Sequence, residues 1–271
     1  MPAVDRSDTL GRRGASISAV ASKCQLRDES QVDISLYRMA RRLLDALLPP
    51  CCIVCGGAGS SRDLDLCPGC AADLPVLTEA CQRCAMPLTG ALHGQTLCGR
   101  CLRKPPPFAA TVCAFRYGWP IHHLLRGLKY RHALPNARVL GQLLAAHLVN
   151  RGADRPDLLC PVPLGPARYR DRGFNQAVEL GRVLEQALSV PMRCDLVARV
   201  RETAEQSTLA RTDRRDNVRG AFRALRSVDA AHVALVDDVV TTGSTVGELA
   251  RVLLEAGARR VDVWAVARTQ R

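Results

Sequence analysis

The chain of 271 residues contains few aromatic residues and no long apolar segment. Aromatic side chains make up 4% of the sequence, so no obvious platform for stacking single-stranded bases is evident. No apolar run approaches the roughly 18 residues that a membrane-spanning helix requires. Arg12 and Arg13 are not followed by the apolar stretch of a secretory signal. We therefore expect a cytoplasmic protein without a membrane span.

Lysine is also scarce, and the basic character of the chain comes from arginine. Lys129 is the only lysine after residue 104, although the formal net charge is +12. A basic surface suits an anionic substrate such as a pyrophosphate ester, and it equally suits nucleic acid. Charge alone does not separate these two classes of ligand. The hydrophobic content of 47% is ordinary for a globular protein of one or two domains.

Cysteine, by contrast, is abundant and regularly spaced. Eight of the thirteen cysteines form four C-x-x-C pairs, namely Cys52/Cys55, Cys67/Cys70, Cys81/Cys84 and Cys98/Cys101. Two such turns supply the four thiolates of a tetrahedral zinc site, and repetition at this separation favours structural zinc over a redox dithiol. Pairing the turns in sequence order gives two sites. A crossed pairing needs longer loops. Cys51 is an alternative to Cys52, and the expected metal content is one or two zinc ions.

The composition divides the chain into segments. We expect residues 1–35 to be disordered, residues 36–50 to contain a short helix, and residues 51–104 to form a double zinc ribbon. Three consecutive prolines then act as a stiff spacer before residues 108–271.

Strand and helix patterns alternate in this last segment. Strands are expected at 111–117, 157–162, 192–197, 233–236 and 260–267, and helices at 121–130, 134–150, 175–188 and after 245. This alternation predicts an α/β fold with a parallel sheet flanked by helices.

The most informative segment reads Val233-Ala-Leu-Val-Asp-Asp-Val-Val-Thr-Thr-Gly-Ser-Thr245. A buried strand leads into Asp237 and Asp238, and a hydroxyl-rich loop then opens an amphipathic helix. Ligands of open α/β sheets bind at the carboxyl ends of the strands, and such a loop offers N–H and O–H groups to a phosphate. The acids can accept hydrogen bonds from sugar hydroxyls. The segment therefore predicts a ribose-5-phosphate site whose phosphate loop comprises Thr241, Thr242, Gly243, Ser244 and Thr245.

A second segment, Pro161 to Gln176, follows another expected strand with an arginine-rich tight turn. Arg168 and Arg172 bring guanidinium groups near the same edge of the sheet, where they suit a pyrophosphate. Asn175 is placed to cap the next helix. Lys129 is a further candidate for a pyrophosphate contact.

A third segment is polar and poor in apolar anchors. Its spacing of three and four residues suggests one face of a mobile lid that closes over a substrate and excludes water. The lid residues are Thr203, Gln206, Arg211 and Arg215.

These segments together resemble the ComF/GntX family, whose members combine a double zinc ribbon with a type I phosphoribosyltransferase-like domain. The resemblance rests on the C-x-x-C pairs, an LKY stretch around Lys129, the PVP…RGFNQ segment, the T-x-x-Q lid and the VDDVVTTGST loop, in that order. It covers about four-fifths of the chain, from residue 51 to Arg268.

The resemblance implies an activity. In type I phosphoribosyltransferases the paired acids hold the ribose 2′- and 3′-hydroxyls of phosphoribosyl pyrophosphate (PRPP), and the loop holds its 5′-phosphate. We therefore expect Mg²⁺-dependent transfer of phosphoribose to an unidentified nucleophilic acceptor, with a link to competence and DNA use. A non-catalytic factor that binds single-stranded DNA or competence proteins, and a PRPP-binding regulator, are the alternatives.

Overall fold

The computed structural model describes residues 51–57, 64–88, 96–201 and 218–270. All of them belong to one compact unit. The disorder expected for residues 1–35 and the helix expected in residues 36–50 lie outside the described residues. Within the described part of the chain, no helix is long and apolar enough to cross a membrane.

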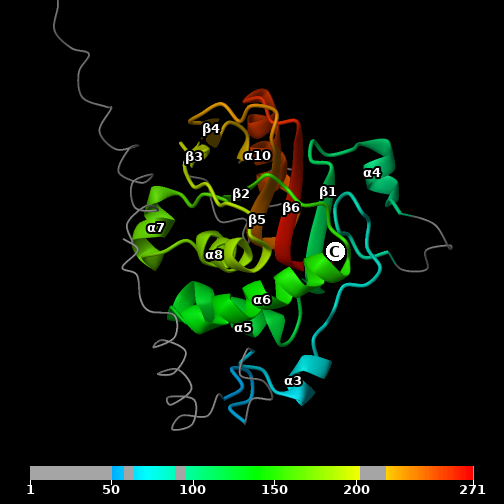
Figure 1. Cartoon of the computed structure of the whole chain (residues 1–271), viewed down its shortest axis with the longest axis vertical. Helices are drawn as coiled ribbons and strands as arrows, with labels where there is room; N and C mark the ends of the chain where they lie inside the picture. The colour runs from blue at the N-terminus through cyan, green and yellow to red at the C-terminus, as the bar shows by residue number, and fades with distance from the viewer. Residues whose placement is uncertain (1–50, 58–63, 89–95, 202–217, 271) are drawn as a thin grey trace, which may run out of the picture. The chain divides into compact units, whose positions relative to one another are not determined.

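The centre of the fold is a four-stranded parallel sheet in the order β1-β6-β5-β2 (Figure 1). The strands are β1 (Ala110–Arg116), β2 (Leu158–Pro161), β5 (His232–Val240) and β6 (Arg260–Arg268). β5 and β6 lie in the middle and are apolar on both faces, as a parallel sheet covered on two sides requires. The expected parallel sheet is therefore present.

Strand β5 is longer than its apolar run indicated. The sequence predicted a strand that ends at Val236, but pairing with β6 continues through both acids to Val240, which lies opposite Arg268. Asp237 and Asp238 are consequently held by the sheet itself, not by a flexible loop. The neighbouring strand provides the hydrogen bonds that extend β5, and a local pattern does not contain that information.

Helices cover both faces of the sheet. On one face, α5 (Ile121–Arg131), α6 (Leu134–Asn150) and α8 (Gln176–Leu188) pack in a cluster that includes Ala234 and Val236. On the other face, α10 (Ser244–Glu255) packs in a cluster with Val233 and Leu235. Alternate residues of β5 therefore pack into the two hydrophobic cores. Burial of both clusters provides the main stabilisation of the fold.

The second, small sheet differs from expectation. A strand was predicted at 192–197, but β3 comprises Val197–Arg199 and pairs antiparallel with β4 (Phe222–Ala224). Met192 forms only a single bridge with Leu159. The apolar residues before Val197 are therefore placed beside the main sheet without continuing as a strand.

The zinc-ribbon module docks on the free edge of β1. Its helices are α3 (Pro68–Ala72) and α4 (Gly99–Arg103). Between them, the N–H of Leu77 donates to the carbonyl of Ala114 at 2.9 Å, and the N–H of Thr111 donates to the carbonyl of Gln82 at 2.9 Å. The module thereby covers the edge strand, whose backbone groups would otherwise be unpaired.

Candidate functional site

A cavity of about 370 Å³ opens at the carboxyl ends of the central strands. Residues predicted from three separate segments line it together: Lys129, Arg168, Arg172, Asp237, Asp238, Thr241, Gly243, Ser244 and Thr245. The parallel topology explains this convergence, because the loops that follow parallel strands meet at one edge of the sheet. Thr242 is the exception among the loop residues, since its buried side chain faces a second cavity.

The loop between β5 and α10 is held in shape by its own polar groups. The hydroxyls of Thr242 and Ser244 lie 2.9 Å apart, and the N–H of Ser244 donates to Thr242 Oγ1 at 3.2 Å. Gly243 has φ of +78°, a left-handed conformation that a side chain disfavours. The loop therefore presents the first turn of α10 to the cavity, as an anion site requires.

The two acids differ in their electrostatics. Burial and the charge of Asp238 raise the pKa of Asp237 well above its usual range. Burial also opposes ionisation of Asp238, but the nearby ammonium of Lys129 outweighs it and lowers the pKa of that carboxyl. Lys129 Nζ forms an ion pair with Asp238 Oδ2. Lys129, which we expected to contact the pyrophosphate, is thus paired with Asp238, which we expected to bind the ribose.

The charge on Lys129 is in turn supported by both acids. Burial lowers the pKa of the ammonium, but the charge of Asp238, joined by that of Asp237, raises it overall. A buried lysine in this setting stays protonated because its attraction to the two acids outweighs the cost of desolvation. The site therefore contains a protonated lysine in an ion pair with one of two neighbouring acids.

The arginine-rich segment forms a short helix, α7 (Pro166–Arg172), and not the tight turn that we expected. Pro166 occupies the first turn, and Gly173 ends the helix at φ of +67°, so the local signals for a helix were present in the sequence. The guanidinium of Arg172 lies 5.4 Å from the centre of the Tyr130 ring. The Arg168 side chain lines the same cavity.

Asn175 has the predicted capping role and a second one. Its Oδ1 accepts from the N–H of Ala177 at 3.0 Å, which caps α8. Its Nδ2 donates to the carbonyl of Val162 at 2.9 Å. One side chain therefore fixes the end of β2 relative to the helix that follows the arginines.

The described lining also includes residues that were given no site role from the sequence, among them Tyr117 and Arg199, although Arg199 stands at the start of the polar lid segment. Tyr117 directly follows β1 at the carboxyl edge of the sheet, so its position after a strand was a usable signal. Arg199 ends β3 and lies over the ring of Phe222 at 5.4 Å. The predicted lid residues Thr203, Gln206, Arg211 and Arg215 lie outside the described residues.

The eight predicted zinc ligands form two clusters in sequence order, Cys52/Cys55/Cys67/Cys70 and Cys81/Cys84/Cys98/Cys101. Within each cluster the sulfur atoms all lie within 4.8 Å of one another. The sulfurs of Cys55 and Cys67 are 3.7 Å apart, as are those of Cys84 and Cys98. A tetrahedral ZnS₄ site with bonds of about 2.3 Å has sulfur–sulfur distances of about 3.8 Å. The geometry fits structural zinc and assigns Cys52, not Cys51, to the first site.

The thiols of the second cluster share negative charge unequally. A hydrogen bond from the thiol of Cys84 and others from nearby backbone amides lower the pKa of Cys81 to about 4, although burial opposes this. The pKa of Cys84 is raised by the same interaction. A zinc ion held by these four sulfurs would stabilise all four thiolates together, because it is divalent.

Two family models match the chain. The double zinc ribbon domain matches residues 43–102, and the phosphoribosyl transferase domain matches residues 171–270. The DNA utilization protein YhgH of Escherichia coli O157:H7 is 35% identical over 226 residues, which cover 82% of this chain and 98% of the relative. The chain belongs to the ComF family.

Another ComF family relative is the competence protein F of Haemophilus influenzae strain Rd, which is 34% identical over 80% of this chain and 96% of its own length. The competence protein ComFC of Bacillus subtilis matches 38% of this chain and 41% of its own length at 34% identity. A solved structure of the allosteric regulatory enzyme of purine biosynthesis overlaps 48% of this chain and 25% of that one, at 24% identity and a TM-score of 0.31. That likeness is too weak to bear on the fold or function of this chain.

Proposed function

We propose that this ComF family protein binds PRPP with Mg²⁺ and transfers its phosphoribosyl group to a nucleophilic acceptor. The observation that carries the proposal is one cavity lined by two carboxylates, by a hydroxyl-rich loop at a helix N-terminus and by the cationic side chains of Lys129, Arg168 and Arg172. Each group matches one part of PRPP: ribose hydroxyls, 5′-phosphate and pyrophosphate.

In this proposal the two acids orient the ribose. Asp237 and Asp238 are fixed by β5, so they accept hydrogen bonds from the 2′- and 3′-hydroxyls without first becoming ordered. The backbone N–H groups and hydroxyls of the loop from Thr241 to Thr245 receive the 5′-phosphate. Anchoring both ends of the sugar exposes C1 in one orientation, which is the main contribution that positioning makes to such a transfer.

The cationic side chains stabilise the leaving group. Arg168 and Arg172 come from α7, and Lys129 reaches the same cavity from α5. Negative charge grows on the pyrophosphate as its bond to C1 breaks, so fixed guanidinium groups lower the barrier more than they strengthen ground-state binding. When the ribose hydroxyls bind to Asp238, Lys129 leaves its ion pair with that carboxylate and contacts the pyrophosphate.

Mg²⁺ fits the donor chemistry of the cavity. It prefers oxygen ligands, keeps several waters and is held largely by the phosphates of its substrate. Asp237 and Asp238 are the carboxylates that line the cavity. When bound, the ion supplies positive charge to the pyrophosphate oxygens.

A screen for pyrophosphate release tests the transfer step. The zinc-loaded protein is mixed with PRPP, Mg²⁺ and one acceptor at a time, starting with nucleobases, ammonia and glutamine. We expect one acceptor to give release that Asp237→Asn/Asp238→Asn abolishes. If PRPP binds but no acceptor gives release, the chain is a PRPP-binding regulator and the catalytic half of the proposal is wrong.

A second candidate function is binding of single-stranded nucleic acid, with or without catalysis. It is favoured by the names of the relatives, which refer to DNA utilization and to competence, and by exposed aromatic rings after β1, where Trp119 is 56% exposed and Tyr117 is 41% exposed. Bases stack on such rings, and arginines contact the phosphates. Binding of an oligonucleotide that falls steeply with salt and is lost in Trp119→Ala would support it.

A further inference from the structure

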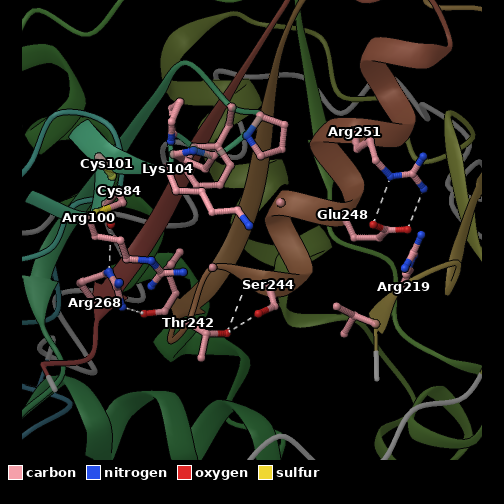
Figure 2. A pocket seen from close by; sticks show the side chains of 18 of the residues that line it. Cys84, Arg100, Cys101, Lys104, Arg219, Thr242, Ser244, Glu248, Arg251 and Arg268 are labelled. Carbon is pink, nitrogen blue, oxygen red and sulfur yellow. Dashed lines mark hydrogen bonds and ion pairs between the residues drawn. The ribbon is translucent and has the colours of Figure 1, made fainter. Parts of the chain in front are cut away.

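A larger cavity, of about 840 Å³, lies where the second zinc-binding half of the ribbon meets the outer side of α10 (Figure 2). Its walls come from α4 and the prolines after it, from residues just beyond 217, and from the first two turns of α10. Cavities of about 300–1,000 Å³ are typical of sites for small molecules. Neither the acids Asp237 and Asp238 nor Arg168 and Arg172 line this cavity.

The charge of its lining is strongly positive. Among the described residues that line it are five cationic side chains and one acid, Glu248, which is already in an ion pair with Arg251. Arg268 is also engaged, because its guanidinium donates to backbone carbonyls. The remaining three, Arg100, Lys104 and Arg219, provide the charge that is available to a ligand.

Two of these three have no partner of their own. Among the described residues, no ion pair or side-chain hydrogen bond engages Arg100 or Lys104. The side chain of Lys104 extends into the space between the ribbon and α10, and Arg100 lies beside the buried Arg268 (Figure 2). Positive side chains that lie close together without an acidic partner indicate an anion-binding site.

One part of the wall is apolar. Pro105, Pro106 and Pro107 line the cavity together with the buried Phe108. Phe108 also approaches the position that a Cβ on Gly243 would take, at 3.9 Å. A ligand that combined a phosphate with a flat apolar group would match the cations and this wall at once.

We propose that this cavity binds a small phosphorylated ligand of the nucleoside monophosphate class, with its phosphate at Arg100 and Lys104 and its base against the proline wall. The cavity volume leaves ample room for one such molecule. The site is separate from the proposed PRPP site, but Gly243 and Ser244 line both cavities. The proposal does not depend on PRPP binding or on transferase activity.

Titration calorimetry on the full-length, zinc-loaded protein tests the site, with AMP, GMP, CMP and UMP as separate probes. We expect saturable binding of at least one of them. Lys104→Glu should weaken it at least tenfold, because the charge beside the phosphate is reversed. Arg219→Gln, on the opposite wall, should weaken it severalfold and gives a second readout that does not touch the ribbon.

The matched control is Arg103→Glu. Arg103 is exposed on the same helix, α4, but it does not line the cavity, so the same change in net charge should leave binding within twofold. Asp237→Asn/Asp238→Asn should also leave it unchanged. The proposal is overturned if no nucleotide binds saturably, if Arg103→Glu weakens binding as much as Lys104→Glu, or if the double Asp variant abolishes it. Binding of an oligonucleotide without binding of any mononucleotide would equally overturn it.

Discussion

Arg268 at the end of β6 donates from Nε to the carbonyl of Cys84 at 3.0 Å, across 184 residues of sequence. The same guanidinium donates from Nη1 to the carbonyls of Val240 at 2.8 Å and of Thr241. The Arg268 side chain is 1% exposed and is therefore shielded from solvent. One buried side chain thus joins a turn of the second cysteine cluster to the start of the phosphate loop.

Replacing this arginine with lysine should loosen both ends of the link. An ammonium cannot reach the same set of carbonyls, and a buried acceptor left unpaired costs about 1–3 kcal/mol. We expect Arg268→Lys to lower the free energy of unfolding in urea and to weaken PRPP binding about tenfold. Arg259→Lys is the control, since Arg259 is 70% exposed and its change should be silent. Unaltered PRPP affinity in Arg268→Lys would show that the loop does not depend on the link.

The left-handed conformation of Gly243 gives a test of the phosphate loop. An added Cβ would meet only Phe108, at 3.9 Å, so any effect comes from the backbone and not from crowding. A non-glycine residue in the left-handed region costs about 1–2 kcal/mol. We expect Gly243→Ala to weaken PRPP binding severalfold, measured by calorimetry.

Gly247 offers a matched control four residues away. It lies inside α10 without a positive φ, and a Cβ there would make ordinary contacts at 4.0 Å. Alanine at a helix interior is about 1 kcal/mol better than glycine, so Gly247→Ala should preserve or raise the melting temperature. If both variants lose PRPP binding equally, the conformation of Gly243 is not the reason.

Lys129 should set the pH dependence of PRPP binding. The pKa of Asp237 is raised, so its carboxylate forms only as pH climbs above the usual aspartate range, and affinity should increase with it. Lys129→Gln removes the charge that lowers the pKa of both acids. The rise in affinity should therefore shift to higher pH in this variant.

Lys129→Arg keeps the charge and should keep the wild-type profile. Protonation of PRPP itself is common to all three proteins, so the difference between their profiles isolates the protein groups. Profiles that coincide for Lys129→Gln and wild type would contradict the assigned role of the ion pair.

Metal content should follow the two cysteine clusters. We expect about two zinc ions per chain in protein purified without chelator, and one in Cys81→Ser. Cys51→Ser should retain both, because Cys51 is exposed and lies outside the clusters. Elemental analysis measures this directly, and a value near zero for the wild type would contradict the zinc assignment.

Much of this fold was readable from local pattern. The bounds of α6 agree with the predicted helix at 134–150, and Asn175 caps α8 as expected. These two predictions were correct because helix periodicity and capping are local properties of the sequence. The strand bounds that we predicted wrongly depend on non-local pairing: the extension of β5 depends on β6, and β3 depends on β4.

The candidate site shows the same division. The acids, the loop and the arginines carry their chemistry in short motifs, and parallel topology brings them together. The ion pair of Lys129 with Asp238 and the link from Arg268 to Cys84 depend on three-dimensional proximity alone. No spacing in the sequence marks the second cavity, because its walls come from segments that are far apart in the chain.

The most direct test of the account is calorimetry of PRPP with Mg²⁺ on the zinc-loaded protein and on Asp237→Asn/Asp238→Asn. Asp229→Asn, at an exposed position outside the cavity lining, is the control for loss of an acidic side chain. The account predicts saturable binding to the wild type and to Asp229→Asn, and affinity at least a hundredfold lower for the double variant. No binding to the wild type, or equal binding to the double variant, would contradict it.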